Sequence, residues 1–132
     1  MGTFTQRIII TNPENPEKSL EIEAVVDTGA TYTWIPKDKL EAIGLKPRYI
    51  RKFKVATGEI IERPVTEALI ELNGERLHTL VAFGDIGSEP LLGAFTLEAF
   101  GLIVDPTNKT LVPAPALLMN IDDKDTNYNG VM

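Results

Sequence analysis

The sequence predicts a mainly β domain, a barrel or a sandwich of short strands with two short helices. Three observations lead to this fold class. Segments rich in β-branched and aromatic residues recur along the chain, and turns such as Asn73-Gly74 separate them, as hairpins require. Helical patterns are short and few, so the strand–helix alternation of a parallel sheet is missing. The length of 132 residues fits one domain.

The first part of the chain reads as strands followed by one helix. In residues 19–26, Leu and Ile alternate with Glu, a period of two that is typical of a strand with one buried face. A short helix is expected between Pro36 and Gly44, because proline favours the first helical position and glycine the end of a helix. The strands predicted here are residues 3–12, 19–26 and 31–35.

The second part of the chain reads as three hairpins and a second helix. The hairpin turns are Thr57-Gly58, Asn73-Gly74 and residues 106–109, each placed between β-rich segments. The predicted helix covers residues 94–100 and ends before Gly101. The strands predicted here are residues 50–56, 60–65, 67–72, 75–83, 91–92, 102–105 and 110–112.

The amino-acid composition excludes several kinds of functional site. The chain has no cysteine and one histidine, His78, so disulfides, thiol nucleophiles and two-histidine metal sites are excluded within one chain. The remaining chemistry must rest on carboxylates, hydroxyls, backbone amides or a hard metal. We expect no metal and no cofactor. No apolar run approaches the roughly 18 residues of a membrane helix, so no membrane partner is expected. The N-terminus shows no secretory pattern, and a cytoplasmic protein is the expectation.

The sequence predicts one domain followed by a tail, and the chain as a whole is acidic. Residues 1–115 are predicted to form the domain, and residues 116–132, which are largely polar, a flexible tail. The segment 46–54 is rich in basic and aromatic residues, as a nucleic-acid stripe would be. The chain as a whole carries a net charge of −6, which repels phosphate, so a solvated strand is favoured and no nucleic-acid partner is expected.

The most informative stretch is Ala24-Val25-Val26-Asp27-Thr28-Gly29-Ala30, an apolar strand that ends in Asp-Thr-Gly. An Asp at such a place is most often only a turn former. Here a short helix, two hairpins and then Leu91-Leu92-Gly93 with a second helix follow it. This motif and this order resemble the retropepsin-like aspartic proteases, the family of the retroviral proteases and their cellular relatives, over roughly residues 5–113.

The resemblance implies the acid protease fold, a closed β-barrel, and assigns roles to named residues. Asp27 would be the catalytic carboxylate, in an active-site loop with Thr28, Gly29 and Ala30. Substrate would lie extended between this loop and a flap at the first hairpin. The implied substrate-binding and flap residues are Thr31, Ile35, Ala56, Thr57, Gly58, Glu59, Leu91 and Leu92, with Trp34 as a further candidate for a pocket wall.

The chain carries a single Asp-Thr-Gly, and metal-free peptide hydrolysis needs a group that both takes and donates a proton. Two carboxylates a hydrogen bond apart provide this, as is generally the case in aspartic proteases. The resemblance therefore implies a homodimeric endopeptidase that acts on peptides or unfolded proteins. Two alternatives stay open: the same dimer as a peptide-binding or scaffolding module, and an unrelated monomeric β domain whose Asp27 only forms a turn.

One pair of positions departs from the retroviral pattern. Those proteases carry Arg directly after the apolar-apolar-Gly motif and an acidic residue two positions after the glycine of Asp-Thr-Gly, and the two side chains pair. This chain has Ala94 and Thr31 there, so both charges are missing together. A buried charge is thus not left without a partner, but the usual means of stabilising the dimer is absent.

Overall fold

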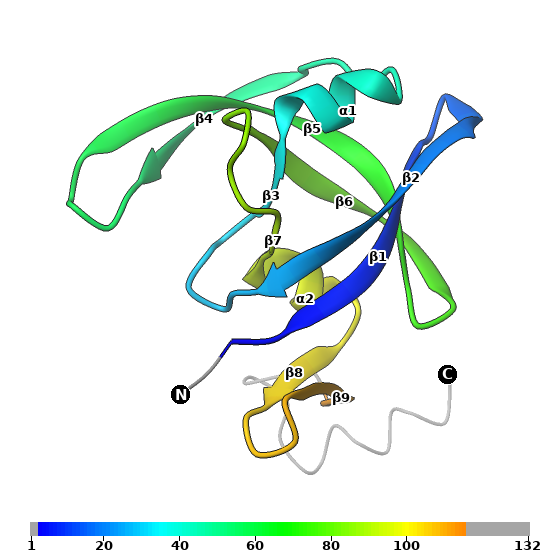
Figure 1. Ribbon diagram of the computed structural model, residues 1–132, viewed down its shortest axis with the longest axis vertical. Coiled ribbons are helices and arrows are strands. Elements are labelled where there is room, and N and C mark those ends of the chain that lie inside the picture. Colours follow the sequence, from blue (N-terminus) through cyan, green and yellow to red (C-terminus); the bar gives the residue numbers. More distant parts are fainter. Residues whose placement is uncertain (1–2, 116–132) are drawn as a thin grey trace, which may run out of the picture.

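The structure, a computed structural model, describes residues 3–115, and this part of the chain is mostly β with two short helices, as the sequence predicts (Figure 1). The predicted tail, residues 116–132, lies outside the described residues. The elements in chain order are β1 (Thr5–Asn12), β2 (Asn15–Val26), β3 (Thr33–Pro36), α1 (Lys37–Ala42), β4 (Tyr49–Lys54), β5 (Ile60–Leu72), β6 (Glu75–Gly84), β7 (Leu91–Leu92), α2 (Ala94–Ala99), β8 (Leu102–Asp105) and β9 (Thr110–Pro113).

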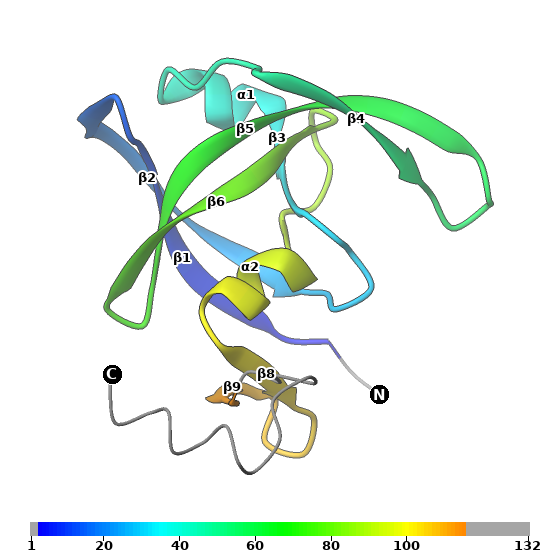
Figure 2. The same cartoon turned by 180° about the vertical axis from the view of Figure 1, so that it is seen from behind.

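Strand pairing follows the order β1-β2-β7-β3-β6-β5-β4, and β1 also pairs with β5, so the pairings return to their starting strand. The strand β4 is the last in this order and has one free edge. A separate two-stranded sheet is formed by β8 and β9. Figures 1 and 2 show α1 near the far end of the β1–β2 hairpin, and α2 between the large sheet and the β8–β9 hairpin. The helix α1 thus lies toward one end of the molecule, and α2 lies nearer its middle.

The core lies inside this ring of strands and is almost entirely aliphatic. Alternate residues point inward because successive side chains of a strand face opposite sides of the sheet. Each fully buried Ile, Leu or Val contributes about 1.5–3 kcal/mol relative to an exposed position. The fully or almost fully buried apolar side chains include Ile8, Ile10, Ala24, Ile35, Leu40, Val65, Ala68, Ile70, Leu72, Val81, Phe83, Leu92 and Leu97.

The predicted division of residues 60–72 into two strands is wrong, because β5 runs through without a break. Its first half pairs with β4 up to Val65, and its second half pairs with β6 from Val65 onward. Pro64 lies where pairing with β6 has not yet begun, so its missing N–H removes no bond from that ladder. The predicted turn at Asn73-Gly74 is confirmed, with φ of 52° and 86° at these residues.

Within residues 3–115, neither helix is long or apolar enough to cross a membrane.

Candidate active site

Asp27 directly follows β2, at the point where the chain leaves the sheet. Its N–H donates to the carbonyl of Leu92 (3.0 Å), which continues the parallel pairing of β2 with β7. The N–H of Gly29 donates to Asp27 Oδ1 (2.9 Å), and the N–H of Ala30 donates to the Asp27 carbonyl (3.1 Å). The carboxylate is half-buried, and its own loop fixes its orientation.

The glycine of Asp-Thr-Gly lies very close to the carboxylate. A Cβ at Gly29 would lie 3.2 Å from Asp27 Oδ1, tighter than ordinary van der Waals contact. Glycine thus allows the backbone amide to approach the carboxylate without a side chain in the way. Thr28, between the two, is exposed at the tip of the loop.

The loop after Asp27 is joined to α2 through the backbone. The N–H of Ala94 donates to the carbonyl of Ala30 (2.7 Å), and the N–H of Phe95 donates to the carbonyl of Thr31 (2.9 Å). These two bonds bring together the positions that form a charged pair in the retroviral proteases. Here the first turn of α2 is held against the loop without any charge.

Three buried threonines reinforce the same junction. The hydroxyl of Thr96 lies 2.7 Å from that of Thr33 and 3.1 Å from that of Thr79. The N–H of Gly93 donates to Thr33 Oγ1 (3.1 Å). Thr33 and Thr96 are fully buried, and each is hydrogen-bonded, so their polar atoms are stabilised in an otherwise apolar core. This hydroxyl network ties β3, β6, β7 and α2 together beneath the Asp27 loop.

A cleft of about 840 Å³ opens beside Asp27. The cleft is lined by the loop that follows Asp27, by residues of β3 and β7, and by the end of β4 with the residues after it. Its lining residues are Asp27, Gly29, Ala30, Thr31, Tyr32, Trp34, Lys52, Phe53, Lys54, Val55, Ala56 and Leu91.

The structure therefore brings part of the predicted site together. Asp27, Gly29, Ala30, Thr31, Ala56 and Leu91 line one cleft, as does the further candidate Trp34. The other three predicted flap residues, Thr57, Gly58 and Glu59, are exposed in the turn between β4 and β5, with a φ of 91° at Gly58. These three residues thus follow directly after the end of β4 and Ala56, which line the cleft.

The structure places Ile35 and Leu92 in the core and not at the cleft, contrary to the substrate-binding role predicted for them. Both side chains are fully buried. Ile35 follows Trp34 and Leu92 follows Leu91, and side chains that follow one another in a strand face opposite sides of the sheet. Trp34 and Leu91 therefore border the cleft, and their neighbours pack inward.

Apart from Trp34, the aromatic residues that line the cleft, Tyr32 and Phe53, were not predicted from the sequence. The ring of Phe53 meets the rings of Tyr32 and Trp34 edge to face, with centroids 5.6 and 5.8 Å apart, and Tyr32 meets Phe95 in the same way at 5.7 Å. Such pairs add about 0.5–1.5 kcal/mol each beyond burial. The alternation of Phe53 and Val55 with Lys52 and Lys54 is the sequence signal that could have identified this face of β4.

The chemistry available in this cleft rests on one carboxylate. Within the described residues, no three His, Asp or Glu side chains come together as metal ligands would. A single carboxylate can accept a proton or, once protonated, donate one. Among the residues that line the cleft, Asp27 is the one carboxylate that could take either role.

Comparison with known proteins addresses the resemblance directly. A family model described as Aspartyl protease matches residues 17–94, more than half of the chain. This range runs from the third residue of β2 to the first residue of α2, and it includes Asp27, the β4–β5 hairpin and the Leu91-Leu92-Gly93 segment. A search of curated proteins finds no match to this chain.

Proposed function

Because the chain belongs to an aspartyl protease family of the retropepsin-like type, we propose that two copies of it form a homodimeric endopeptidase with Asp27 of each copy at the shared active site. The supporting observation is the position of Asp27, which lies in a cleft bordered by a hairpin. The Asp-Thr-Gly motif that contains it occurs once in the sequence. We also infer that the ring of paired strands is the closed barrel of this family.

The proposed dimer supplies what one chain lacks. Two carboxylates within hydrogen-bonding distance cannot both be ionised, so they share one proton, as is general for aspartic proteases. The pair then titrates as a unit and not as two separate residues. The exposed position of Thr28 beside Asp27 suits a hydrogen bond to the loop of the partner across the twofold axis.

The proposed reaction needs only water and this pair. The ionised carboxylate takes a proton from a water molecule while the water oxygen attacks the carbonyl carbon of the peptide bond. The protonated carboxylate donates its proton to the carbonyl oxygen, which gives a tetrahedral diol. The C–N bond then breaks as the amine leaves with a proton from one carboxyl group. The other carboxylate takes a proton from one hydroxyl of the diol, which collapses to the new carboxylic acid, and the pair again holds a single proton.

An extended peptide fits the geometry of the cleft. Residues 29–31 and the end of β4 line the cleft, and β4 is the last strand in the pairing order of the described residues, so its outer edge can offer unpaired backbone groups to a substrate strand. The β4–β5 hairpin, with its exposed tip at residues 57–59, is proposed to close over the bound peptide and exclude water.

The test compares the unaltered protein with Asp27→Asn. Digestion of unfolded β-casein at mildly acidic pH is followed by mass spectrometry, and the molar mass of both proteins in solution is measured by light scattering. We expect cleavage by the unaltered protein, no cleavage by Asp27→Asn, and a dimer in both cases. Equal cleavage by the variant would refute the catalytic role of Asp27. A dimer that binds peptides but cleaves none would identify the binding module, and a strict monomer would contradict both readings.

A further inference from the structure

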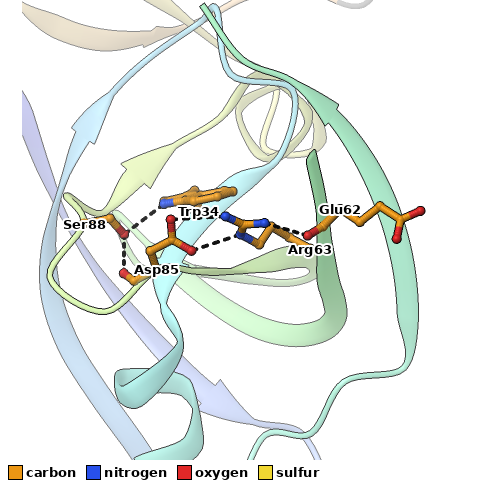
Figure 3. Close-up of polar contacts among 5 residues, drawn as sticks. All are labelled: Trp34, Glu62, Arg63, Asp85 and Ser88. Carbon is orange, nitrogen blue, oxygen red and sulfur yellow. Dashed lines mark hydrogen bonds and ion pairs between the residues drawn. The ribbon is translucent and has the colours of Figure 1, made fainter. Parts of the chain in front are cut away.

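Trp34 lines the cleft, and its side chain is hydrogen-bonded to a residue outside the cleft (Figure 3). It lies on β3, is half-buried, and pairs with Leu91 on the neighbouring strand. Its indole N–H donates to Ser88 Oγ (3.0 Å). The ring therefore borders the cleft beside Asp27, while its polar edge is held by the loop between β6 and β7.

Ser88 is itself held in place. Its hydroxyl donates to the carbonyl of Asp85 (2.6 Å), and its N–H donates to the same carbonyl (3.0 Å). Because the Ser88 hydroxyl donates its hydrogen bond to the Asp85 carbonyl, the lone pairs of Ser88 Oγ are available to accept from the indole N–H. Ser88 is thus an acceptor of fixed orientation for Trp34.

The loop that carries Ser88 is fastened to β5 by a two-bond ion pair. Arg63 Nε lies 3.0 Å from Asp85 Oδ1, and Arg63 Nη2 lies 3.2 Å from Asp85 Oδ2. The remaining nitrogen, Nη1, donates to the carbonyl of Glu62 (2.7 Å). The Arg63 side chain is only 27% exposed, and a paired guanidinium of this geometry is more rigid than a single surface contact.

The faces of the indole ring are confined as well. A Cβ at Gly84 would overlap with Trp34 Nε1, so only glycine lets the indole lie this close to the backbone of β6. The ring of Phe53 meets the indole edge to face at a centroid distance of 5.8 Å. The backbone at Gly84, the ring of Phe53 and the hydrogen bond to Ser88 together hold the indole in one orientation.

We propose that Ser88, fixed by the Arg63–Asp85 ion pair, is a positioning residue that holds Trp34 as the rigid wall selecting the size of the substrate's apolar side chain. The substrate side of this inference rests on the proposed peptidase function, and the positioning of the indole does not. Without the Ser88 hydroxyl, the indole turns about its own side-chain bonds. The wall then yields to side chains of different size, and each is bound less tightly.

The positioning can be measured without any substrate, because Trp34 is the single tryptophan of the chain. Acrylamide quenching of tryptophan fluorescence is compared for the unaltered protein, Ser88→Ala and Ser88→Thr. We expect Ser88→Ala to raise the quenching constant about twofold, and Ser88→Thr, which keeps a hydroxyl, to leave it unchanged. Ser19→Ala is the matched control, since Ser19 is exposed on β2 at the far end of its hairpin with β1.

The selection of side chains is measured on peptides copied from the best casein site, with Ala, Leu or Phe at one apolar position beside the cleaved bond. We expect Ser88→Ala to raise KM for the preferred peptide about three- to tenfold, the effect of one lost hydrogen bond, with little change in kcat. The ratio of kcat/KM between preferred and disfavoured peptides should fall. Ser88→Thr should restore both values.

Asp85→Asn provides a second variant in case Ser88→Ala fails to fold, and Glu14→Gln, which removes the exposed Arg48–Glu14 pair, is its control. We expect increased quenching and raised KM for Asp85→Asn alone. Unchanged quenching in both Ser88→Ala and Asp85→Asn overturns the proposal. Increased quenching with an unchanged peptide preference also overturns it. If casein is not cleaved at all, the peptidase function fails, while quenching still decides whether Ser88 positions the indole.

Discussion

At Gly93 the chain passes so close to the Asp27 loop that a side chain has no room. A Cβ there would lie 2.5 Å from the carbonyl carbon and oxygen of Tyr32 and 2.9 Å from the carbonyl oxygen of Ala30. The apolar-apolar-Gly motif thus has a steric cause in this chain, independent of any resemblance. The glycine lets β7 and α2 approach the loop that carries the catalytic candidate.

Gly93→Ala should therefore destabilise the fold by about 3 kcal/mol, because the contact is with backbone, which cannot rotate away. Urea unfolding measures the loss. Gly74→Ala is the control, since Gly74 has a positive φ but open space around it, and should cost about 1–2 kcal/mol. A smaller loss at Gly93 than at Gly74 would contradict the steric explanation.

Thr33→Val tests the buried hydroxyls below the same loop. Valine keeps the shape but leaves the Gly93 N–H without its acceptor and removes one of the two hydroxyl partners of Thr96, at a cost of about 1–3 kcal/mol. Chemical denaturation checks this, with Thr110→Val at an exposed position of β9 as the matched control. Equal stability of the two variants would mean that the hydroxyl network contributes nothing to holding α2 in place.

At the scale of elements, local sequence predicted most strands and both helices, because period-two patterns, Asn73-Gly74 and the glycines at helix ends act within a few residues. The continuity of β5 could not be predicted in this way, since it depends on β4 and β6 pairing with different halves of one strand. The same holds for the aromatic contacts of Phe53. Tyr32 and Trp34 reach it only through the pairing of distant strands.

The β8–β9 hairpin depends on one carboxylate at its turn. Asp105 accepts hydrogen bonds from the Asn108 side chain (2.9 Å) and from the N–H groups of Asn108 (3.3 Å) and Thr107 (3.0 Å). The Asn108 side chain contributes most, and together these bonds lower the pKa of Asp105 below 3.8. A lowered folded-state pKa stabilises the fold above the unfolded-state value, and this contribution disappears as pH falls through the folded-state value.

Asp105→Asn should therefore lower the thermal midpoint at about pH 7 and have progressively less effect below about pH 4. Thermal unfolding of both proteins, followed by circular dichroism across this range, measures the difference. Asp38→Asn is a suitable control, because Asp38 is exposed on α1, far along the chain from this turn. A difference that grows as the solution is acidified would show that the Asp105 turn does not act as described.

At the scale of the whole molecule, the order of motifs predicted the family, but no pattern within one chain specifies how two chains meet. Each copy carries a net charge of −6, so two copies repel each other at long range, and added salt favours their association. The charged pair of the retroviral proteases is replaced by backbone bonds from Ala94 and Phe95. Those bonds hold each loop within its own chain, and the proposed dimer must draw its stability from other contacts.

Mixing experiments test whether activity belongs to the pair. Unaltered protein and Asp27→Asn are refolded together in equal amounts, and casein cleavage is compared with unaltered protein at the same total concentration. If a dimer needs Asp27 from both copies, random pairing leaves about one quarter of the activity, because mixed dimers are inactive. Chains that act alone would retain about one half, since each unaltered copy would keep its full rate. Separate refolding of the two proteins before mixing is the control, and it should preserve about one half as long as the dimers do not exchange.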